Sequence, residues 1–350
     1  MQYKNKELSM QYKNIDIHNV ACLVESEDGG VSWLRFPQEV ASEFEGGEGA
    51  YNVARYATGV ELRFVIESGG SATITMSKRE DDGITHTFRV NRGGVQGGWE
   101  DADIQNIVCI QPKEFIIKRS KNIDAIRKVS PNNAFSPEVV RVIFDRGRYK
   151  LLGVSDNVRP PRPDEVPSKS ILFYGSSITH GSNALDMPHS FASVIGRKLN
   201  YDVYNLGMAG NCRIEHKTID YISSLDWNVA VLELGINVLD WEEEKIAERV
   251  DYALNNLAAK HQDKPVIMIS PFYCDNDLLC DGIRSKKWRK IMEERIRKAD
   301  LPNVTYVNGL DILNKSEYLT ADLVHPNVDG VQKIADDLYP IITAEIRKYE

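Results

Sequence analysis

The first half of the chain consists of short apolar runs separated by turn residues. The runs occupy residues 20–24, 33–36, 61–67, 72–77, 85–90, 106–111 and 139–144. In Leu62-Arg-Phe-Val-Ile66 the apolar positions roughly alternate, as in a strand with one buried face, and Gly-Gly pairs at 69–70, 93–94 and 97–98 interrupt the pattern. Several short strands with turn signals between them predict an antiparallel β-sandwich.

From residue 171 onward the period of the pattern changes. Fully apolar runs at 171–174, 203–206, 229–234, 266–269 and 304–307 alternate with stretches of helical periodicity at 190–199, 215–223, 242–260, 285–299 and 330–347. Strands that are apolar on both faces belong in a parallel sheet with helices on both sides. We therefore expect an α/β domain with five parallel strands, and with its chemistry at their carboxyl ends.

The stretch at 155–168 separates the two patterns and contains four prolines. Proline removes a backbone donor and restricts φ, so this stretch predicts an extended linker rather than a helix or a central strand. The predicted organisation is a flexible lead-in at 1–14, a sandwich domain at 15–155, a linker at 156–169 and an α/β domain at 170–350. A chain of 350 residues has room for two such domains, each with its own core.

Composition narrows the class of protein. Apolar residues make up 42% of the chain and charged residues 27%, as in a soluble globular protein. The net charge of -8 and the lack of a basic cluster argue against a nucleic-acid partner, and no apolar run approaches the roughly 20 residues that cross a bilayer. Five scattered cysteines and a polar N-terminus predict reduced thiols in a cytoplasmic protein without a membrane partner.

The candidate chemistry begins in Ile171-Leu-Phe-Tyr-Gly-Ser-Ser-Ile-Thr-His-Gly-Ser182. A buried strand ends here in Gly175-Ser176-Ser177. A serine on a tight turn at the carboxyl end of such a strand lies where α/β folds place a nucleophile. The same residues also suit a plain strand-to-helix loop, so this stretch alone does not decide between the two.

Three further blocks follow in order, each just after an apolar run: Asn205-Leu-Gly-Met-Ala-Gly210, Gly235-Ile-Asn237 and Asp322-Leu-Val-His325-Pro326. Together the four blocks resemble those of the SGNH hydrolase superfamily, also called the GDSL esterases, over residues 170–349. The resemblance implies a three-layer α/β/α hydrolase fold. It also implies ester hydrolysis through an acyl-serine intermediate, with no metal and no cofactor.

The resemblance assigns a role to each block. Ser177 stands at the nucleophile position, and Gly210 and Asn237 match the residues that donate to the oxyanion together with the Ser177 N–H. The spacing of Asp322 and His325 supports the remaining pair separately, because a carboxylate three residues before an imidazole on a turn can orient it as a base. The alternative for this pair is a helix-capping aspartate followed by an incidental histidine.

Two positions depart from the family pattern, and two more residues are weaker candidates. Ser176 stands where the family usually has aspartate, and Val238 follows Asn237 where aspartate is common; we expect neither change to abolish catalysis. His180 is a candidate for substrate binding because it is close to Ser177 in sequence. Trp241 is another, because an indole can stack on a sugar ring. The alternatives are an ordinary loop histidine and an ordinary packed aromatic.

A jelly-roll or sandwich domain ahead of an SGNH domain resembles the arrangement of several carbohydrate acetylesterases. This resemblance makes removal of acetyl groups from acetylated xylan, mannan or an oligosaccharide the leading hypothesis. The main alternative is a lipase, acylhydrolase or acyltransferase acting on a lipid or another small-molecule ester, and a third is a non-catalytic binding protein. The expected partner is an acylated carbohydrate or other small ester, and a homo-oligomer stays open.

Overall fold

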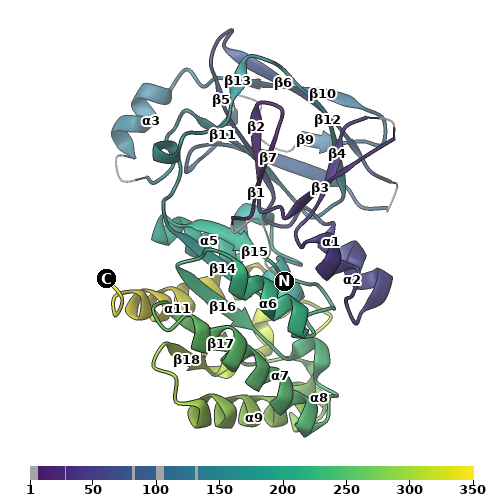
Figure 1. Cartoon of the computed structure of the whole chain (residues 1–350), viewed down its shortest axis with the longest axis vertical. Helices are drawn as coiled ribbons and strands as arrows, with labels where there is room; N and C mark the ends of the chain where they lie inside the picture. The colour runs from purple at the N-terminus through teal and green to yellow at the C-terminus, as the bar shows by residue number, and fades with distance from the viewer. Residues whose placement is uncertain (1–6, 28, 81–82, 100–105, 131–132) are drawn as a thin grey trace.

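The computed structural model describes residues 7–27, 29–80, 83–99, 106–130 and 133–350. A β-sandwich built from the first half of the chain is stacked on one edge of an α/β domain built from the second half (Figure 1). Both predicted architectures are present, so the predicted fold class is confirmed.

The sandwich consists of two antiparallel sheets. The first has the strand order β1-β2-β5-β11-β7-β8, with β13 paired to β5 and β9 paired to β7, and the second has the order β10-β6-β12-β4-β3. The strands of the first sheet are β1 (Ser9–Tyr12), β2 (Ile15–His18), β5 (Glu61–Ile66), β7 (His86–Arg92), β8 (Val95–Gln96), β9 (Asn106–Val108), β11 (Val139–Phe144) and β13 (Val158–Arg159). Those of the second are β3 (Cys22–Glu25), β4 (Val31–Leu34), β6 (Ser71–Lys78), β10 (Lys113–Lys118) and β12 (Tyr149–Val154).

Strand alternation sends every second side chain of β5 into the sandwich core. Leu62 and Phe64 are buried in that core, while Glu61 and Arg63 lie on the outer face of the sheet. These two charged residues are buried as well. Charged side chains on an outer strand face are buried only if something else covers that face, and here the α/β domain covers it.

The sequence-based division of the first half needs correction. Part of the lead-in expected at 1–14 is a strand, because β1 pairs with β2; residues 1–6 lie outside the described residues. The stretch expected to be a linker contains β13 and a short 3-10 helix, Pro163–Glu165. The apolar pattern also does not predict β10, β12 and three helices, which are α1 (Gln38–Ala41), α2 (Gly47–Ala54) and α3 (Ile123–Val129).

The second domain has five parallel strands in the order β15-β14-β16-β17-β18. The strands are β14 (Ser170–Tyr174), β15 (Asp202–Asn205), β16 (Val229–Glu233), β17 (Val266–Ile269) and β18 (Val304–Val307). The helices are α4 (Ser177–His180), α5 (Phe191–Leu199), α6 (His216–Ser224), α7 (Glu243–Asn256), α8 (Asp275–Leu279), α9 (Ile283–Ala299), α10 (Gly309–Ile312) and α11 (Val328–Ile346). This order places β14, which leads to Ser177, between β15 and β16.

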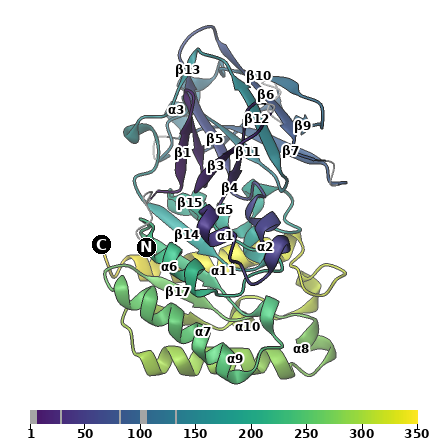
Figure 2. The ribbon, with the colours of Figure 1, turned by 45° about the vertical axis from the view of Figure 1, so that its right-hand side comes forward.

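Helices cover both faces of the parallel sheet (Figure 2). The helices α6, α7 and α9 share one apolar cluster with the sheet, and α5, α10 and α11 share the other. In β14, Leu172 and Tyr174 point to the first cluster and Ile171 and Phe173 to the second, which is why the strand is apolar throughout. Among the described residues, no helix combines the length and the hydropathy of a bilayer span.

The strand β15 is at the edge of its sheet, and its free edge faces the sandwich. The N–H groups of Asp202 and Leu206 donate to carbonyl groups on the β14 side, at 2.8 Å in both cases. Because strands in a parallel sheet bond to each side through alternate residues, Val203 and Asn205 turn their backbone groups to the open edge. Such an edge leaves donors and acceptors unpaired unless something covers it.

Buried side chains of the sandwich pair this edge. Asn19 accepts from the Asn205 N–H (3.0 Å) and donates to the Asn205 carbonyl (3.0 Å), as a neighbouring strand would. Arg35 donates to the same carbonyl (3.1 Å), and His18 Nε2 donates to the Val203 carbonyl (2.8 Å). All three side chains are buried, so they replace a sixth strand at this edge.

Gly59 allows the two domains to approach this closely. Its φ of 70° lies in the left-handed region, which favours glycine. A Cβ at Gly59 would lie 2.8 Å from Asn19 Nδ2 and 2.9 Å from the Asn205 Cβ. A larger residue would therefore push the sandwich away from β15.

Charged residues extend the same interface. Arg63 binds both carboxylate oxygens of Asp202 (2.7 Å each) and also Glu61 (2.8 Å), and Arg141 Nε binds Glu61 (2.7 Å). Burial opposes ionisation of Glu61, but Arg141 and Arg63 hold the pKa of Glu61 well below its usual range. Removing one member of this network by mutation would leave its partner as an unpaired buried charge, which is costly.

His18, a buried histidine at this interface, predicts that the free energy of unfolding depends on pH. Burial and the neighbouring Arg63 lower the pKa of His18, which donates to the Val203 carbonyl. As the pH falls through about 6.5, the unfolded chain takes up a proton at His18 before the folded chain does, so stability falls until the pH reaches the lower folded-state pKa. Each pKa unit between the two states is worth about 1.4 kcal/mol.

We therefore expect the free energy of unfolding to fall more steeply in the wild type than in His18→Gln between about pH 7.5 and about pH 5. Glutamine keeps a donor for the Val203 carbonyl but does not titrate, which makes it the matched control. Urea unfolding at each pH measures the difference. Parallel profiles for the two proteins would contradict the assignment.

Candidate active site

The nucleophile turn follows from the local sequence. Gly175 and Ser176 make the turn after β14, and Ser177 is the first residue of α4. Gly175 has no room for a side chain, because a Cβ there would lie 2.3 Å from Thr179 Oγ1 and 2.8 Å from Glu233 Oε2. Ser177 lies at the carboxyl edge of the sheet and is largely buried, with 7% of its surface exposed.

A buried carboxyl group supports this turn. Glu233, the last residue of β16, accepts hydrogen bonds from the Ser176 N–H (2.8 Å), the Ser176 hydroxyl (2.6 Å) and the Thr179 hydroxyl (3.1 Å). Burial raises the pKa of Glu233. Ser176 also caps α4, since its Oγ accepts from the Ile178 N–H (3.1 Å). The turn therefore keeps a carboxyl partner despite the missing aspartate, and that partner comes from the neighbouring strand.

His325 connects Ser177 to Asp322. Its Nε2 lies 2.8 Å from Ser177 Oγ, and its Nδ1 lies 2.8 Å from Asp322 Oδ2. An ionised carboxylate only accepts hydrogen bonds, so Nδ1 carries the proton and Nε2 is left to accept the proton of the serine hydroxyl. The structure brings these three residues together in the order that a serine nucleophile requires.

A tight turn before α11 orients Asp322. Its Oδ1 accepts from the Thr320 hydroxyl (2.8 Å) and from the N–H groups of Val324 (2.9 Å) and His325 (2.9 Å). Partial burial opposes ionisation, but these N–H donors and the His325 ring hold the pKa of Asp322 well below its usual range. Leu323 completes the turn with a φ of 61°, a conformation that costs a non-glycine residue about 1–3 kcal/mol.

The donors expected for an oxyanion come from the loops of three adjacent strands. Asn237 follows β16, and its Oδ1 accepts a hydrogen bond from the Cys212 N–H (3.0 Å). This contact fixes the orientation of the side-chain amide and leaves Nδ2 available as a donor. Gly210, after β15, has a φ of 68°. Its N–H, like that of Ser177 at the start of α4, has no acceptor among the described residues. Their contact with an oxyanion stays a prediction.

Asn205 ties the domain interface to these loops. Its side-chain oxygen accepts from the Gly207 N–H (2.9 Å), and its amide nitrogen donates to the Thr179 carbonyl in α4 (2.8 Å). The backbone of the same residue is held by Asn19 and Arg35 of the sandwich. One buried residue therefore links the sandwich, the nucleophile helix and the loop that carries Gly210.

The sandwich also reaches the Gly210 loop directly. Between α1 and α2, Gly46 packs so closely on Asn211 that a Cβ at Gly46 would lie 2.2 Å from Asn211 Oδ1. Glu45 anchors this segment to α7 through ion pairs with Arg249 and with Lys245 (3.4 Å for the latter). The α1–α2 segment is therefore part of the surroundings of the candidate site.

His180 and Trp241, the two weaker candidates for substrate binding, both contact other side chains of the protein. His180 is fully buried, its Nε2 lies 2.7 Å from the Thr58 hydroxyl, and burial lowers the pKa of His180 well below its usual value. This corrects the expectation that His180 contacts substrate, because its side chain belongs to the domain interface.

Trp241 is half-buried, with Lys245 Nζ 4.2 Å from its ring centre. The Lys245 ammonium therefore covers one face of the Trp241 ring. No contact among the described residues tests whether Trp241 stacks on a sugar, so this stays a prediction.

Sequence reasoning missed three supporting residues. Glu233 carries a signal, because a charged residue at the end of an otherwise apolar strand needs buried partners. Asn205 opens one of the four blocks, so its position is visible in the sequence but its contacts are not. No comparable signal marks Thr320, whose contact with Asp322 depends on the shape of the turn.

The cavities found at the domain interface and around α8 and α9 lie apart from this site. Among the described residues, no group of three or more His, Cys, Asp or Glu side chains is placed to hold a metal ion. The cavities at the domain interface and around α8 and α9 are lined by none of Ser177, His325 and Asp322. None of these cavities is therefore the place where the serine reacts.

Comparison with protein families agrees with this geometry. The model of the GDSL-like Lipase/Acylhydrolase family matches residues 168–343, which is half of the chain and includes all four blocks. The chain belongs to this family. It is a family of ester hydrolases, so the predicted enzyme class is confirmed.

Solved structures share the fold of both domains. The chain is similar to salicylyl-acyltransferase SsfX3 from a tetracycline biosynthetic pathway, with a TM-score of 0.74, 14% identity and coverage of 97% of this chain and 98% of that one. It is similar to a family two carbohydrate esterase from Cellvibrio japonicus (TM-score 0.59, 12% identity, 98% of each chain). An acetyl xylan esterase from the rumen bacterium Butyrivibrio proteoclasticus gives a TM-score of 0.57 at 12% identity over 96% and 97% of the two chains.

Identities this low establish a common fold and leave the substrate open. No curated protein sequence matches the chain.

The amide of Asn237 predicts a specific kinetic effect. Asn237→Ala should lower kcat for ester hydrolysis by about 10²–10³-fold with little change in KM, because the amide would donate to charge that develops only in the transition state. Asn256→Ala is the control, since it removes an amide at the end of α7 that donates to the Tyr252 carbonyl (3.2 Å) and is not part of the candidate site. Steady-state kinetics of both variants measure the difference, and equal losses would contradict the role.

The carboxyl group under the nucleophile turn predicts a second effect. Glu233→Ala leaves three buried donors without an acceptor, so it should destabilise the fold by about 3 kcal/mol or more and lower kcat as the turn relaxes. Glu233→Gln keeps the shape of the side chain and an oxygen acceptor for these donors, so this variant should retain more stability and activity than Glu233→Ala. Urea unfolding and kinetics test both. Equal damage from the two variants would show that the negative charge is required.

Proposed function

We propose that the protein is a serine esterase that hydrolyses short-chain O-acyl esters, with O-acetyl groups on carbohydrate as its substrates. The observation that carries the esterase reaction is the hydrogen-bonded chain from Ser177 Oγ through His325 to Asp322, with both links at 2.8 Å. Membership of an ester hydrolase family supports the same reaction.

The first half of the reaction forms an acyl-serine. His325 Nε2 accepts the proton of Ser177 Oγ as this oxygen attacks the ester carbonyl carbon, and Asp322 stabilises the imidazolium that results. The negative charge on the carbonyl oxygen is taken by the N–H groups of Ser177 and Gly210 and by Asn237 Nδ2. The tetrahedral intermediate then expels the alcohol, which leaves with the proton from His325.

The second half releases the acid. A water molecule gives a proton to His325 Nε2 and attacks the acyl carbon, and the same three donors hold the second oxyanion. Collapse of this intermediate breaks the bond to Ser177 Oγ, which takes the proton back from His325. The carboxylic acid leaves, and the enzyme returns to its starting state.

The surroundings of Ser177 support a short acyl group and a large alcohol. A long acyl chain needs an enclosed apolar channel, and the interface cavity does not reach Ser177. The candidate site is open to solvent around Gly210 and Asp322, because Gly210 is exposed and the Asp322 side chain is 47% exposed. By analogy, a carbohydrate esterase and an acetyl xylan esterase with both domains support a sugar ester.

A second candidate function is acyl transfer, or hydrolysis of a lipid or other small-molecule ester, by the same triad. It is favoured by the full-length likeness to a salicylyl-acyltransferase. A structural observation also favours it: Leu278, Leu279 and Ile283 are exposed on α8 and at the start of α9. These helices follow β17 at the carboxyl edge of the sheet, where apolar side chains could contact an apolar substrate.

The acyl preference distinguishes the candidates. Cleavage of p-nitrophenyl esters from acetyl to decanoyl should be fastest for acetyl, measured as kcat/KM, and Ser177→Ala should lower it by about 10³-fold or more. Ser182→Ala, five residues further along, is the control and should keep activity, because no hydrogen bond joins its hydroxyl to the described residues. Acetylated xylan and xylo-oligosaccharides are the next substrates, with released acetate as the readout.

Each other outcome points elsewhere. A preference for long chains would replace the sugar ester with a lipid substrate. Faster product formation with an added alcohol than with water alone would indicate acyl transfer. No cleavage by the wild type, together with no labelling of Ser177 by a fluorophosphonate, would overturn the serine-esterase proposal.

A further inference from the structure

Three arginines of the first half of the chain form a positively charged cluster. Arg55 directly follows α2, and Arg146 and Arg148 are in the turn between β11 and β12. Arg55 and Arg148 both donate to Asn52 Oδ1, at 3.4 and 3.3 Å. Arg146 and Arg148 both lie against the Tyr56 ring, with their guanidinium carbons 5.0 and 5.7 Å from its centre. We call these three residues the arginine cluster.

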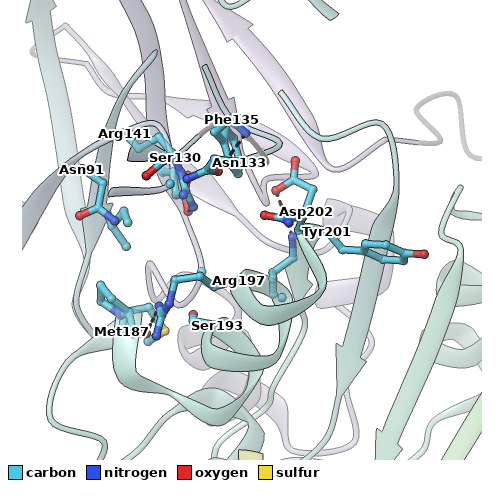
Figure 3. Close-up of a pocket in the computed structure, with 18 of the residues that line it drawn as sticks. Asn91, Ser130, Asn133, Phe135, Arg141, Met187, Ser193, Arg197, Tyr201 and Asp202 are labelled. Carbon is cyan, nitrogen blue, oxygen red and sulfur yellow. Dashed lines mark hydrogen bonds and ion pairs between the residues drawn. The ribbon is translucent and has the colours of Figure 1, made fainter. Parts of the chain in front are cut away.

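Ion pairs do not cancel the charge of the arginine cluster. Glu80 pairs with Arg148, but the other two arginines form no ion pair with a described residue. Arg141 at the interface cavity, by contrast, is paired with Glu61 at 2.7 Å (Figure 3). In the cluster three positive charges meet one carboxylate, although the chain as a whole has a net charge of -8. Like charges at short range repel one another, and an anion would relieve this repulsion.

Two further acids lie on the same segments without pairing with the cluster. Asp145, in the β11–β12 turn, accepts hydrogen bonds from the Thr87 hydroxyl and from the Met187 N–H (2.9 Å). Burial raises the pKa of Asp145, which disfavours its charged form. Glu48 is on the first turn of α2, at the opposite end of the helix from Arg55, and forms no ion pair with a described residue. The positive charge of the cluster is therefore available to a ligand.

The arginine cluster is both accessible and held in place. Arg146 is exposed, Arg55 is half-buried, and the side chain of Arg148 is 13% exposed. The guanidinium of Arg55 lies 5.4 Å from the centre of the Tyr51 ring, so each of the three arginines is in contact with an aromatic ring. Side chains that are already held lose less conformational entropy when they bind a ligand.

The cluster borders the helix of the nucleophile. The Tyr56 ring packs edge-on against the His180 ring, with 5.8 Å between their centres. Burial lowers the pKa of His180, and the charges of Arg35 and Arg146 lower it further. His180 is the last residue of α4, which begins with Ser177, and four helical residues span about 6 Å. An ester at Ser177 and an anionic group on the cluster can therefore belong to one substrate molecule.

We propose that the arginine cluster binds the carboxylate of a uronic acid residue in the acylated carbohydrate. A planar guanidinium pairs with a carboxylate through two hydrogen bonds, and carboxylate is the anionic group of carbohydrates built from sugar residues alone. The carbohydrate rests on the proposed function, whereas the need for an anion follows from the charges of the cluster. The substrate is then an acidic glycan rather than a neutral one.

Binding of acidic and neutral oligosaccharides to the whole protein tests the proposal. The acidic probes are trigalacturonate and a xylotriose that carries one glucuronic acid, and their neutral counterparts are galactotriose and xylotetraose. In calorimetric titrations at about 0.15 M salt, at least one acidic probe should bind about tenfold or more tightly than its counterpart, as expected for a charge-assisted hydrogen bond. This preference should decrease as the salt concentration rises.

Variants locate the binding site. Arg55→Gln and Arg146→Gln should each weaken binding of the acidic probe by about fivefold, the effect of one partly exposed ion pair, and should leave binding of the neutral probe unchanged. Arg146→Lys should keep more affinity than Arg146→Gln. The matched control is Arg127→Gln, which removes a surface arginine of α3 that pairs with Asp124 and Glu138 and should leave the preference unchanged.

Three results would overturn the proposal. They are equal binding of acidic and neutral probes, equal weakening by Arg127→Gln and Arg146→Gln, and tighter binding of D-glucose 6-phosphate than of both acidic oligosaccharides, which would indicate a phosphate site. Thermal unfolding of each variant shows whether it folds. If Arg55→Gln does not fold, Arg146→Gln decides the question, because the Arg146 side chain is exposed.

These titrations do not involve ester cleavage, so they separate this inference from the proposed function. An active esterase without a preference for acidic probes would overturn the inference alone. A preference for acidic probes in a protein that cleaves no ester would overturn the proposed function alone.

Discussion

The free edge of β15 is the constraint on which the two-domain structure depends. Its backbone donors and acceptors need partners, and buried side chains of the sandwich, including Asn19 and Arg35, supply them. Asn205, which receives these bonds, also bonds to Thr179 in the nucleophile helix and to Gly207 in the next loop. The hydrogen bonds that join the domains therefore continue through Asn205 to the nucleophile helix and the loop that carries Gly210. Domain packing and the geometry of the candidate active site depend on the same hydrogen-bond network.

Two carboxyl groups support the candidate site, and their environments separate their roles. Burial raises the pKa of Glu233, which accepts three hydrogen bonds under the nucleophile turn and serves as a structural acceptor. Backbone N–H donors lower the pKa of Asp322, which keeps its charge and holds the His325 ring. The same functional group thus acts in two ways, and burial makes the difference, because Glu233 is fully buried whereas the Asp322 side chain is 47% exposed.

Local pattern predicts the elements but not the contacts between distant segments. β14 and β17 are predicted almost to the residue, because a strand buried on both faces is apolar throughout. β1 and β13 are short, and only their pairing with β2 and β5 makes them strands. Ser177, Asp322 and His325 are visible as motifs. His180 is misplaced because proximity in sequence does not show which way α4 points it, and Glu233 supports Ser176 from 57 residues away.

The α1–α2 segment contributes to the substrate-binding rim, while the reacting residues come from the second half of the chain. A one-domain hydrolase must combine these two functions in one domain. The α1–α2 segment comes from the first half of the chain, packs on the α/β domain, is anchored to α7 by Glu45, and places Gly46 against Asn211 in the loop that carries Gly210. Its apolar side chains, such as Phe44 and Val53, share a core with the parallel sheet, so changes at its exposed positions would reshape the rim around a substrate without disturbing that core. In evolutionary terms, substrate range can diversify in the first domain while the reaction chemistry in the second stays constant.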